Sequence, residues 1–212
     1  MPLDQHGRHF RHSQRQGEGH LAFRTRLLDE ALRMQEAITV IARSPLPFVA
    51  AVRGPCIGAG LDLAAACDVR VATADAYFSL REVRIGVVAD LGSLQRLPRL
   101  IGAGATRELA LTGRDVPAEE ARSLGLVTRV LDSAEELSTY AGGLAAEIAG
   151  HPRHVVAGIK EICEQTLHLS VAEGLRYTAV WNSAFLPAPE LPGLLADALR
   201  VPAAGRTTVA NG

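Results

Sequence analysis

The sequence predicts an α/β core followed by a region that is entirely helical. Short apolar segments of strand length alternate with segments of helical periodicity as far as residue 132, and from there only helical periodicity continues. The chain has 212 residues, of which 48% are hydrophobic, and this is enough for one substantial core with a smaller appendage. Four regions follow from this pattern: a flexible basic arm at 1–20, the core at 21–132, a helical region at 133–200 and a disordered tail at 201–212.

The first predicted element is a helix that begins at Leu21. Proline excludes helical geometry at the residue before it, so the segment SPLP ends this helix at Ser44. The segment Phe48–Arg53 is short and apolar, which predicts a buried strand that ends at Gly54. The helix is recognised by apolar residues at a spacing of three or four, namely Leu27, Leu28, Ala31, Met34, Ala37, Ile38 and Ile41.

The later elements follow in order. A glycine-rich loop leads into a short helix at 61–67, and strands are expected at 68–73 and 77–80. After Gly92, two helical stretches lie on either side of Gly102 and Gly104. Pro117 and the acids behind it open another helix, and 127–131 is a strand. The remaining helices are predicted at 133–149, 152–167, 170–185 and 189–200.

Composition argues against several classes of partner. The net charge is −1 and aromatic residues make up only 4% of the chain, which disfavours nucleic acid and anionic membranes as partners. The three cysteines include no CxxC pair, so neither a disulfide framework nor a zinc site is expected. A metal tract at His6, His9 and His12 is an alternative to a simple basic arm. No apolar run could span a bilayer and no secretory signal is present, so a cytoplasmic location is expected.

The glycine-rich loop Gly54–Asp68, GPCIGAGLDLAAACD, has two interpretations. Small residues at Gly58, Ala59 and Gly60 could expose main-chain amides at a helix N-terminus, where they would stabilise an oxyanion. Alternatively, the glycines only allow tight packing. A nucleotide site is not favoured, since neither GxGxxG nor GxxxxGK[ST] occurs.

Three acids lie in or beside apolar sequence near this loop: Asp62, Glu82 and Asp90. Carboxylates in such surroundings have raised pKa values and can exchange protons near neutral pH. The alternative is that each acid caps a helix or pairs with an arginine. Arg81, Arg84 and Arg96 are the candidates for such pairs.

Residues 50–102, AAVRGPCIGAGLDLAAACDVRVATADAYFSLREVRIGVVADLGSLQRLPRLIG, resemble the enoyl-CoA hydratase/isomerase (crotonase) family. LTGRDVPAEEARSLGLVTRVL and HPRHVVAGIKE resemble it too, and the likeness covers about 21–186. It implies a crotonase-like ββα spiral core and a C-terminal helical region that joins subunits into a homotrimer or a dimer of trimers. It also implies an acyl-CoA thioester as substrate, with no further cofactor and no metal.

Within the family, the triple Asp62, Glu82 and Asp90 resembles the dienoyl-CoA isomerases, which convert 3,5-dienoyl-CoA to 2,4-dienoyl-CoA. By this resemblance Glu82 and Asp90 transfer the protons, with Glu82 nearer the α-carbon, and Asp62 orients or polarises them. The amide of Ala59 would stabilise the thioester oxyanion, beside Gly58 and Gly60. A hydratase would carry glutamate at the position of Asp62 and commonly glycine at that of Asp90.

The resemblance also predicts that the chain is shortened at its N-terminus. Family members have first strands and an F-x-x-G-x-D-like loop before the helix that begins here near Leu21, and nothing similar occurs in 1–20. That loop supplies a second oxyanion amide, whose loss costs on the order of 10²–10³ in rate. Two alternatives to the isomerase therefore stay open: an enoyl-CoA hydratase, or a subunit of low or no activity that only assembles with others.

Overall fold

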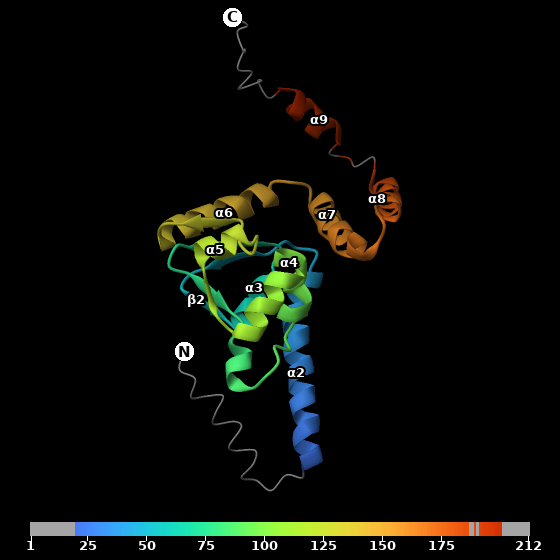
Figure 1. Cartoon of the computed structure of the whole chain (residues 1–212). Helices are drawn as coiled ribbons and strands as arrows, with labels where there is room; N and C mark the ends of the chain where they lie inside the picture. Colours follow the sequence, from blue (N-terminus) through green and yellow to red (C-terminus); the bar gives the residue numbers. More distant parts are fainter. Residues whose placement is uncertain (1–19, 187–188, 190, 201–212) are drawn as a thin grey trace, which may run out of the picture. The chain divides into compact units, whose positions relative to one another are not determined.

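The computed structural model describes residues 20–186, 189 and 191–200 (Figure 1). They form two compact units, of which the first ends at Glu147 and the second begins at Ile148. Residues 1–19 of the predicted arm, with the histidines at positions 6, 9 and 12, and the predicted tail at 201–212 lie outside the described residues, while His20 begins the first described helix. None of the helices in the described ranges is both long and apolar enough to cross a bilayer.

The first unit contains two small sheets that the chain visits in turn. The first sheet has the order β1-β3-β6 and is parallel, with β1 at Val49–Val52, β3 at Val69–Thr73 and β6 at Arg129–Leu131. The second has the order β2-β4-β5, with β2 at Pro55–Ile57, β4 at Tyr77–Ser79 and β5 at Asp115–Pro117. Here β2 pairs parallel to β4, and β5 pairs antiparallel to β4. The strands β1 to β4 alternate between the two sheets. The pair β1 and β2 therefore adds one strand to each sheet, and the pair β3 and β4 does the same.

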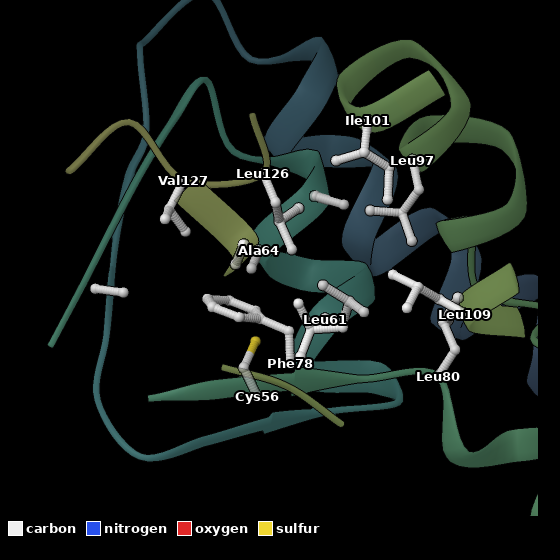
Figure 2. Packing of buried hydrophobic residues seen from close by; sticks show 14 of the residues in the cluster. Cys56, Leu61, Ala64, Phe78, Leu80, Leu97, Ile101, Leu109, Leu126 and Val127 are labelled. Carbon is white, nitrogen blue, oxygen red and sulfur yellow. The ribbon is translucent and has the colours of Figure 1, made fainter. Parts of the chain in front are cut away.

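Helices of this unit pack around α3, Ala59–Ala66. Its small side chains let α2, His20–Arg43, α4, Ser93–Thr112, and β2 all contact it. The main core includes Leu61 and Ala64 of α3, Phe78 and Leu80 of the β4 region, and Leu97 of α4; Figure 2 shows these side chains pointing toward one another. The 3₁₀-helix η1, Arg81–Ile85, follows β4, while α5, Ala118–Ser123, and α6, Ala134–Ala149, come later.

The helical stretches predicted around Gly102 form one element, α4, with a kink. Gly102 has φ 79° and ψ 159°, which is not helical, and Pro98 lies one turn earlier. The short helix predicted at 61–67 begins two residues earlier, at Ala59, because Gly58 rather than Gly60 is its N-cap. The strands β2 and β5 were not predicted, and each has only three residues.

The second unit is helical, as the sequence predicts. Helix α7 spans Arg153–Gln165, the 3₁₀-helix η2 spans Thr166–His168, α8 spans Val171–Phe185 and α9 spans Leu191–Arg200. A capping box between Ser170 and Glu173 starts α8, because each side chain binds the backbone amide of the other residue. Gly158 of α7 lies directly against the Trp181 indole of α8, so a side chain at position 158 would collide with it.

Candidate active site

Asp62 lies in the first turn of α3 and is buried, with 1% of its surface exposed. Its Oδ1 accepts two hydrogen bonds from Ser93 at the start of α4. The backbone amide and the hydroxyl of Ser93 both lie 2.5 Å away. Asp62 therefore connects the beginnings of two helices.

Opposing effects act on the pKa of Asp62. Burial is the largest, and it raises the pKa because the charged form loses hydration. The two Ser93 hydrogen bonds and the charge of Arg96 lower the pKa, whereas the charge of Asp90 raises it. The combined result is a pKa of Asp62 above its ordinary value. The Ser93 and Arg96 donors therefore offset only part of the cost of burying this carboxylate.

Glu82 lies in η1, with its carboxylate against the glycine-rich loop. A Cβ at Gly58 would be 3.1 Å from Glu82 Oε1, and Gly58 has a left-handed φ of 54°, so both geometry and space favour glycine there. Glu82 Oε2 is buried and has no hydrogen-bond partner among the described residues. Burial raises the pKa of Glu82, and the charges of Asp62 and Asp90 raise it further.

Asp90 lies in the loop between η1 and α4, between the buried residues Ala89 and Leu91. Its side chain is exposed, and its carbonyl accepts a hydrogen bond of 2.6 Å from the Gln35 side chain of α2. Its charge acts on both Asp62 and Glu82. The structure thus brings Asp62, Glu82 and Asp90 into one electrostatic group, here called the acid cluster.

The three small residues of the loop differ in what their amides can do. The Gly58 amide donates to the Ser79 carbonyl at 3.1 Å, so it is already used. Ala59 and Gly60 are the first two residues of α3 and are exposed, and their amides have no acceptor within the described part of the chain. Amides at this position carry partial positive charge, which suits an anionic ligand atom.

The arginines that could have neutralised the acids bind elsewhere for the most part. Arg81 forms a bidentate ion pair with Asp115, in which Nε donates to Oδ1 at 3.0 Å and Nη2 donates to Oδ2 at 2.5 Å. Arg96 donates to the Leu91 carbonyl and to Thr39 Oγ1, both at 3.2 Å, and only its charge acts on Asp62. The alternative that each acid caps a helix or pairs with an arginine fits Asp62, which accepts from the Ser93 amide at the start of α4. Glu82 makes no ion pair with any described residue.

Two residues of this region were missed from the sequence, Ser93 and Gln35, whereas Arg96 was named only as a candidate ion-pair partner. Serine directly after Gly92 and before an apolar run is a known helix-start signal, and a helix was predicted to begin at this point. That signal says nothing about a partner 31 positions away. The contacts of Arg96 and Gln35 depend likewise on how α2 and α4 pack.

Cys56 of β2 is buried close to Asp62. Its burial, followed by the charges of Asp62 and Cys67, raises the pKa of the thiol to about 12. The thiol therefore stays protonated at neutral pH, so Cys56 packs beside Asp62 and does not act as a nucleophile. In the described part of the chain, no group of three or more His, Cys, Asp or Glu residues is arranged to hold a metal ion.

Comparison with known proteins identifies the family of the chain. A family model described as "Enoyl-CoA hydratase/isomerase" matches residues 17–185. The chain is 45% identical over 158 residues to a peroxisomal Delta(3,5)-Delta(2,4)-dienoyl-CoA isomerase of Arabidopsis thaliana, covering 74% of this chain and 57% of that protein. It is 44% identical over 166 residues to the mitochondrial Delta(3,5)-Delta(2,4)-dienoyl-CoA isomerase of Homo sapiens, covering 78% and 51%. The chain thus spans about half the length of these curated relatives.

The fold is shared with solved structures. An enoyl-CoA hydratase from Bacillus anthracis superposes with a TM-score of 0.78 at 29% identity, covering 88% of this chain and 71% of that one. The α/β architecture predicted from the sequence is therefore confirmed as crotonase-like. On the matched family model, the shared fold and the identity to named relatives, the chain belongs to the enoyl-CoA hydratase/isomerase family.

Proposed function

We propose that the protein is a dienoyl-CoA isomerase that shifts the double bonds of a 3,5-dienoyl-CoA to the 2,4 positions. The observation that carries this proposal is the acid cluster, in which Glu82 has a buried oxygen without a partner and feels the charges of two further acids. The relatives named as dienoyl-CoA isomerases support it. This chain spans about half the length of these relatives, so we propose their activity for it by similarity.

The reaction removes a proton from C2 and returns one to C6, so it needs groups that reach both carbons. In the proposed mechanism, the Glu82 carboxylate takes the C2 proton, and the electron pair forms a dienolate with its charge on the thioester oxygen. Asp90, as the carboxylic acid, then gives its proton to C6 and leaves the 2,4-diene. Glu82 loses its proton and Asp90 regains one before the next turnover; the exposure of Asp90 gives it access to water.

The raised pKa of Glu82 suits this role. A general base works best when its pKa lies near the working pH, and an ordinary exposed glutamate is too weak a base for a carbon acid. Burial and the charge of Asp62 raise the pKa of Glu82 in that direction, and both act while Asp90 carries its proton. In this mechanism Asp62 stays negatively charged, and its charge keeps the pKa of Glu82 raised.

The Ala59 amide is the proposed donor to the dienolate oxygen. It lies at the exposed N-terminus of α3, and Gly58 places the Glu82 carboxylate against the same turn. A single good oxyanion donor contributes about 3–4 kcal/mol to catalysis. Gly60 would contribute its amide and free space rather than a contact, since a Cβ there would meet nothing within 4 Å.

Aliphatic side chains near the acid cluster fit an acyl substrate. The segment between Glu82 and Asp90 exposes four of them, namely Val83, Ile85, Val87 and Val88. Val88 is 73% and Ile85 is 70% exposed. An acyl chain would cover such surface, and the transfer of apolar area from water favours binding by about 25 cal/mol per Å².

The test is an isomerase assay with Glu82→Gln, Asp90→Asn and the double variant, run in D₂O with mass spectrometry of the product. Each single variant is expected to lose about 10²–10⁴ in kcat, because each removes a positioned acid or base. The double variant should lose little more than the worse single variant, since both acids serve one proton relay. Asp75→Asn, which changes an exposed acid in the turn after β3, is the matched control and should keep full activity.

Two other results would replace this proposal. Addition of water to a 2-enoyl-CoA, without isomerisation of the diene, would make the protein a hydratase. Unchanged behaviour of the double variant would indicate a subunit that serves only assembly.

Assembly as a homotrimer or dimer of trimers and a cytoplasmic location stay predictions. Sedimentation velocity tests the first of them. The two relatives are named for the peroxisome and the mitochondrion, so imaging of the tagged protein in its own cells is needed for the second.

A further inference from the structure

The acid cluster depends on a serine that is not itself an acid or base. We propose that Ser93 is a positioning residue of the proposed reaction, which fixes Asp62 in one orientation as the permanent negative charge beside Glu82. This inference rests on the proposed function, and it assigns a role to a side chain outside the three acids.

The contact between Ser93 and Asp62 is fully enclosed. Ser93 has no exposed surface and Asp62 has 1%. The Ser93 amide and hydroxyl both donate to Asp62 Oδ1 at 2.5 Å, whereas no hydrogen bond to Oδ2 is formed among the residues that the structure describes. The hydroxyl distance is typical of an O–H donor to an ionised oxygen. Ser93 therefore fixes Asp62 Oδ1, while Oδ2 stays free to interact with the other acids of the acid cluster.

The start of α4 is built around this carboxylate. Its N-cap is Gly92, with φ 121° and no side-chain cap, so Asp62 of α3 supplies the acceptor that a capping side chain would give. Glycine is favoured at position 92 because side-chain residues rarely adopt a φ of 121°, and a Cβ there would also displace the Arg96 guanidinium. The helix dipole of α4 and the charge of Arg96 both favour the ionised form of Asp62.

Groups from α4, from the loop before it, from η1 and from β2 interact with Asp62. Ser93 and Arg96 of α4 favour its charge, while burial in α3 and the charge of Asp90 oppose it. Glu82 of η1 and Cys56 of β2 also face it, and both have raised pKa values partly because of the Asp62 charge. Removal of the Ser93 hydroxyl would shift this balance toward protonated Asp62, and Glu82 would then lose part of its basicity.

A serine that only stabilises the start of α4 would behave differently. Its loss would weaken α4 without changing the titration of Asp62 or the pH dependence of the reaction. The two roles are therefore separated by a titration, not by a stability measurement.

The experiment uses the whole chain labelled with ¹³C at the aspartate carboxyl carbons, with the Asp62 signal assigned from Asp62→Asn. In Ser93→Ala we expect the midpoint of the Asp62 titration to move to higher pH and the acidic limb of the isomerase pH profile to move with it. The expected loss in kcat is roughly 10-fold to 10²-fold, as for a misplaced catalytic group. Ser93→Thr, which keeps a hydroxyl, should restore the wild-type midpoint.

The matched control is Thr106→Val, which removes another buried hydroxyl from α4. Thr106 is 3% exposed, and its Oγ1 donates to the Gly102 carbonyl at 2.8 Å. This variant should change neither the titration nor the pH profile. If Ser93→Ala does not fold, Ser93→Cys replaces it, because a thiol of similar size is a much weaker donor.

An unchanged Asp62 midpoint in Ser93→Ala or Ser93→Cys would overturn the inference, whatever happens to the rate. A wild-type chain without isomerase activity would instead contradict the proposed function. The titration needs no substrate, so these two failures are distinguishable.

Discussion

Two polar sites are buried in the same unit, and they are satisfied to different degrees. Arg70 of β3 is 5% exposed, and its guanidinium donates to the carbonyls of Leu126 and Cys67 at 2.8 and 2.6 Å, with a third, longer contact to Ala64 at 3.5 Å. The acid cluster has one strongly held oxygen, on Asp62, and one buried oxygen without a partner, on Glu82.

This difference separates a structural site from the proposed functional one. Buried polar groups are normally hydrogen-bonded, and a fully bonded group has nothing left to offer a ligand. Arg70 joins the strand β3 to the chain segments after α3 and before β6. Glu82 keeps an unused acceptor and a raised pKa, and these are the properties that a proton-transfer group needs.

The largest expected effect on stability comes from Arg70→Met. The change leaves the carbonyls of Leu126 and Cys67 buried without donors, at a cost of about 1–3 kcal/mol each. For a chain of this size the melting temperature should fall by roughly 5–15 °C. Thermal unfolding followed by circular dichroism measures the shift.

Arg53→Met is the control for Arg70→Met, since Arg53 is exposed and the substitution is the same. It should change stability by less than about 0.5 kcal/mol. Equal melting temperatures for the two variants would show that Arg70 is not the structural site described above.

A smaller effect, with opposite signs at neighbouring positions, is expected in the glycine-rich loop. Gly58→Ala should destabilise the protein by about 1–2 kcal/mol, because φ is left-handed and Glu82 Oε1 lies 3.1 Å from the new Cβ. Gly60→Ala should stabilise it by up to about 1 kcal/mol, because it lies in α3 with open space around it. Urea unfolding of both variants measures the pair, and a gain at position 58 would contradict the geometry.

The smallest effect is a difference in pH dependence between two glutamates. The pKa of Glu82 is raised above 4.5 in the folded state, so the folded protein holds this proton more tightly and loses stability as the pH rises through that window. The advantage of Glu82→Gln over wild type should therefore grow with pH above about 4.5 and disappear below it.

Glu120 should show the reverse dependence. Its hydrogen bonds from Arg114 hold its pKa below 4.5, so its stabilising contribution is present above 4.5 and is lost as the pH falls through the folded-state pKa. Glu120→Gln should thus be less stable than wild type near neutrality and equal to it in acid. Chemical unfolding from pH 3 to 8 measures both variants, and the same sign for the two would contradict the contrast.

The sequence predicted those parts of the fold whose cause is local. The break at Gly102, the helix start at Ala118 and the strand at 49–52 all follow from residues within a few positions. The strand Pro55–Ile57 was missed because it has no alternation and exists only through its pairing with Tyr77–Ser79. Short strands of this kind are decided by tertiary contacts rather than by propensity.

The candidate site divides in the same way. The acids could be found because a carboxylate in apolar sequence is unusual, and the structure brings the three into one electrostatic group. The partner of Asp62 could not be found, since the contact with Ser93 joins two helix starts that only packing brings together. The roles of the individual acids stay predictions until the variants are measured.

The enclosed Cys56 has a practical consequence. A thiol with a pKa of about 12 and little exposure reacts with alkylating reagents only when the surrounding structure opens. Cys163 of α7 is exposed and can be replaced by serine, which leaves a chain whose slow labelling comes from buried sulfur alone. Fragmentation mass spectrometry, which distinguishes Cys56 from the buried Cys67 in the same tryptic peptide, would then report without any substrate how often the structure around Asp62 opens.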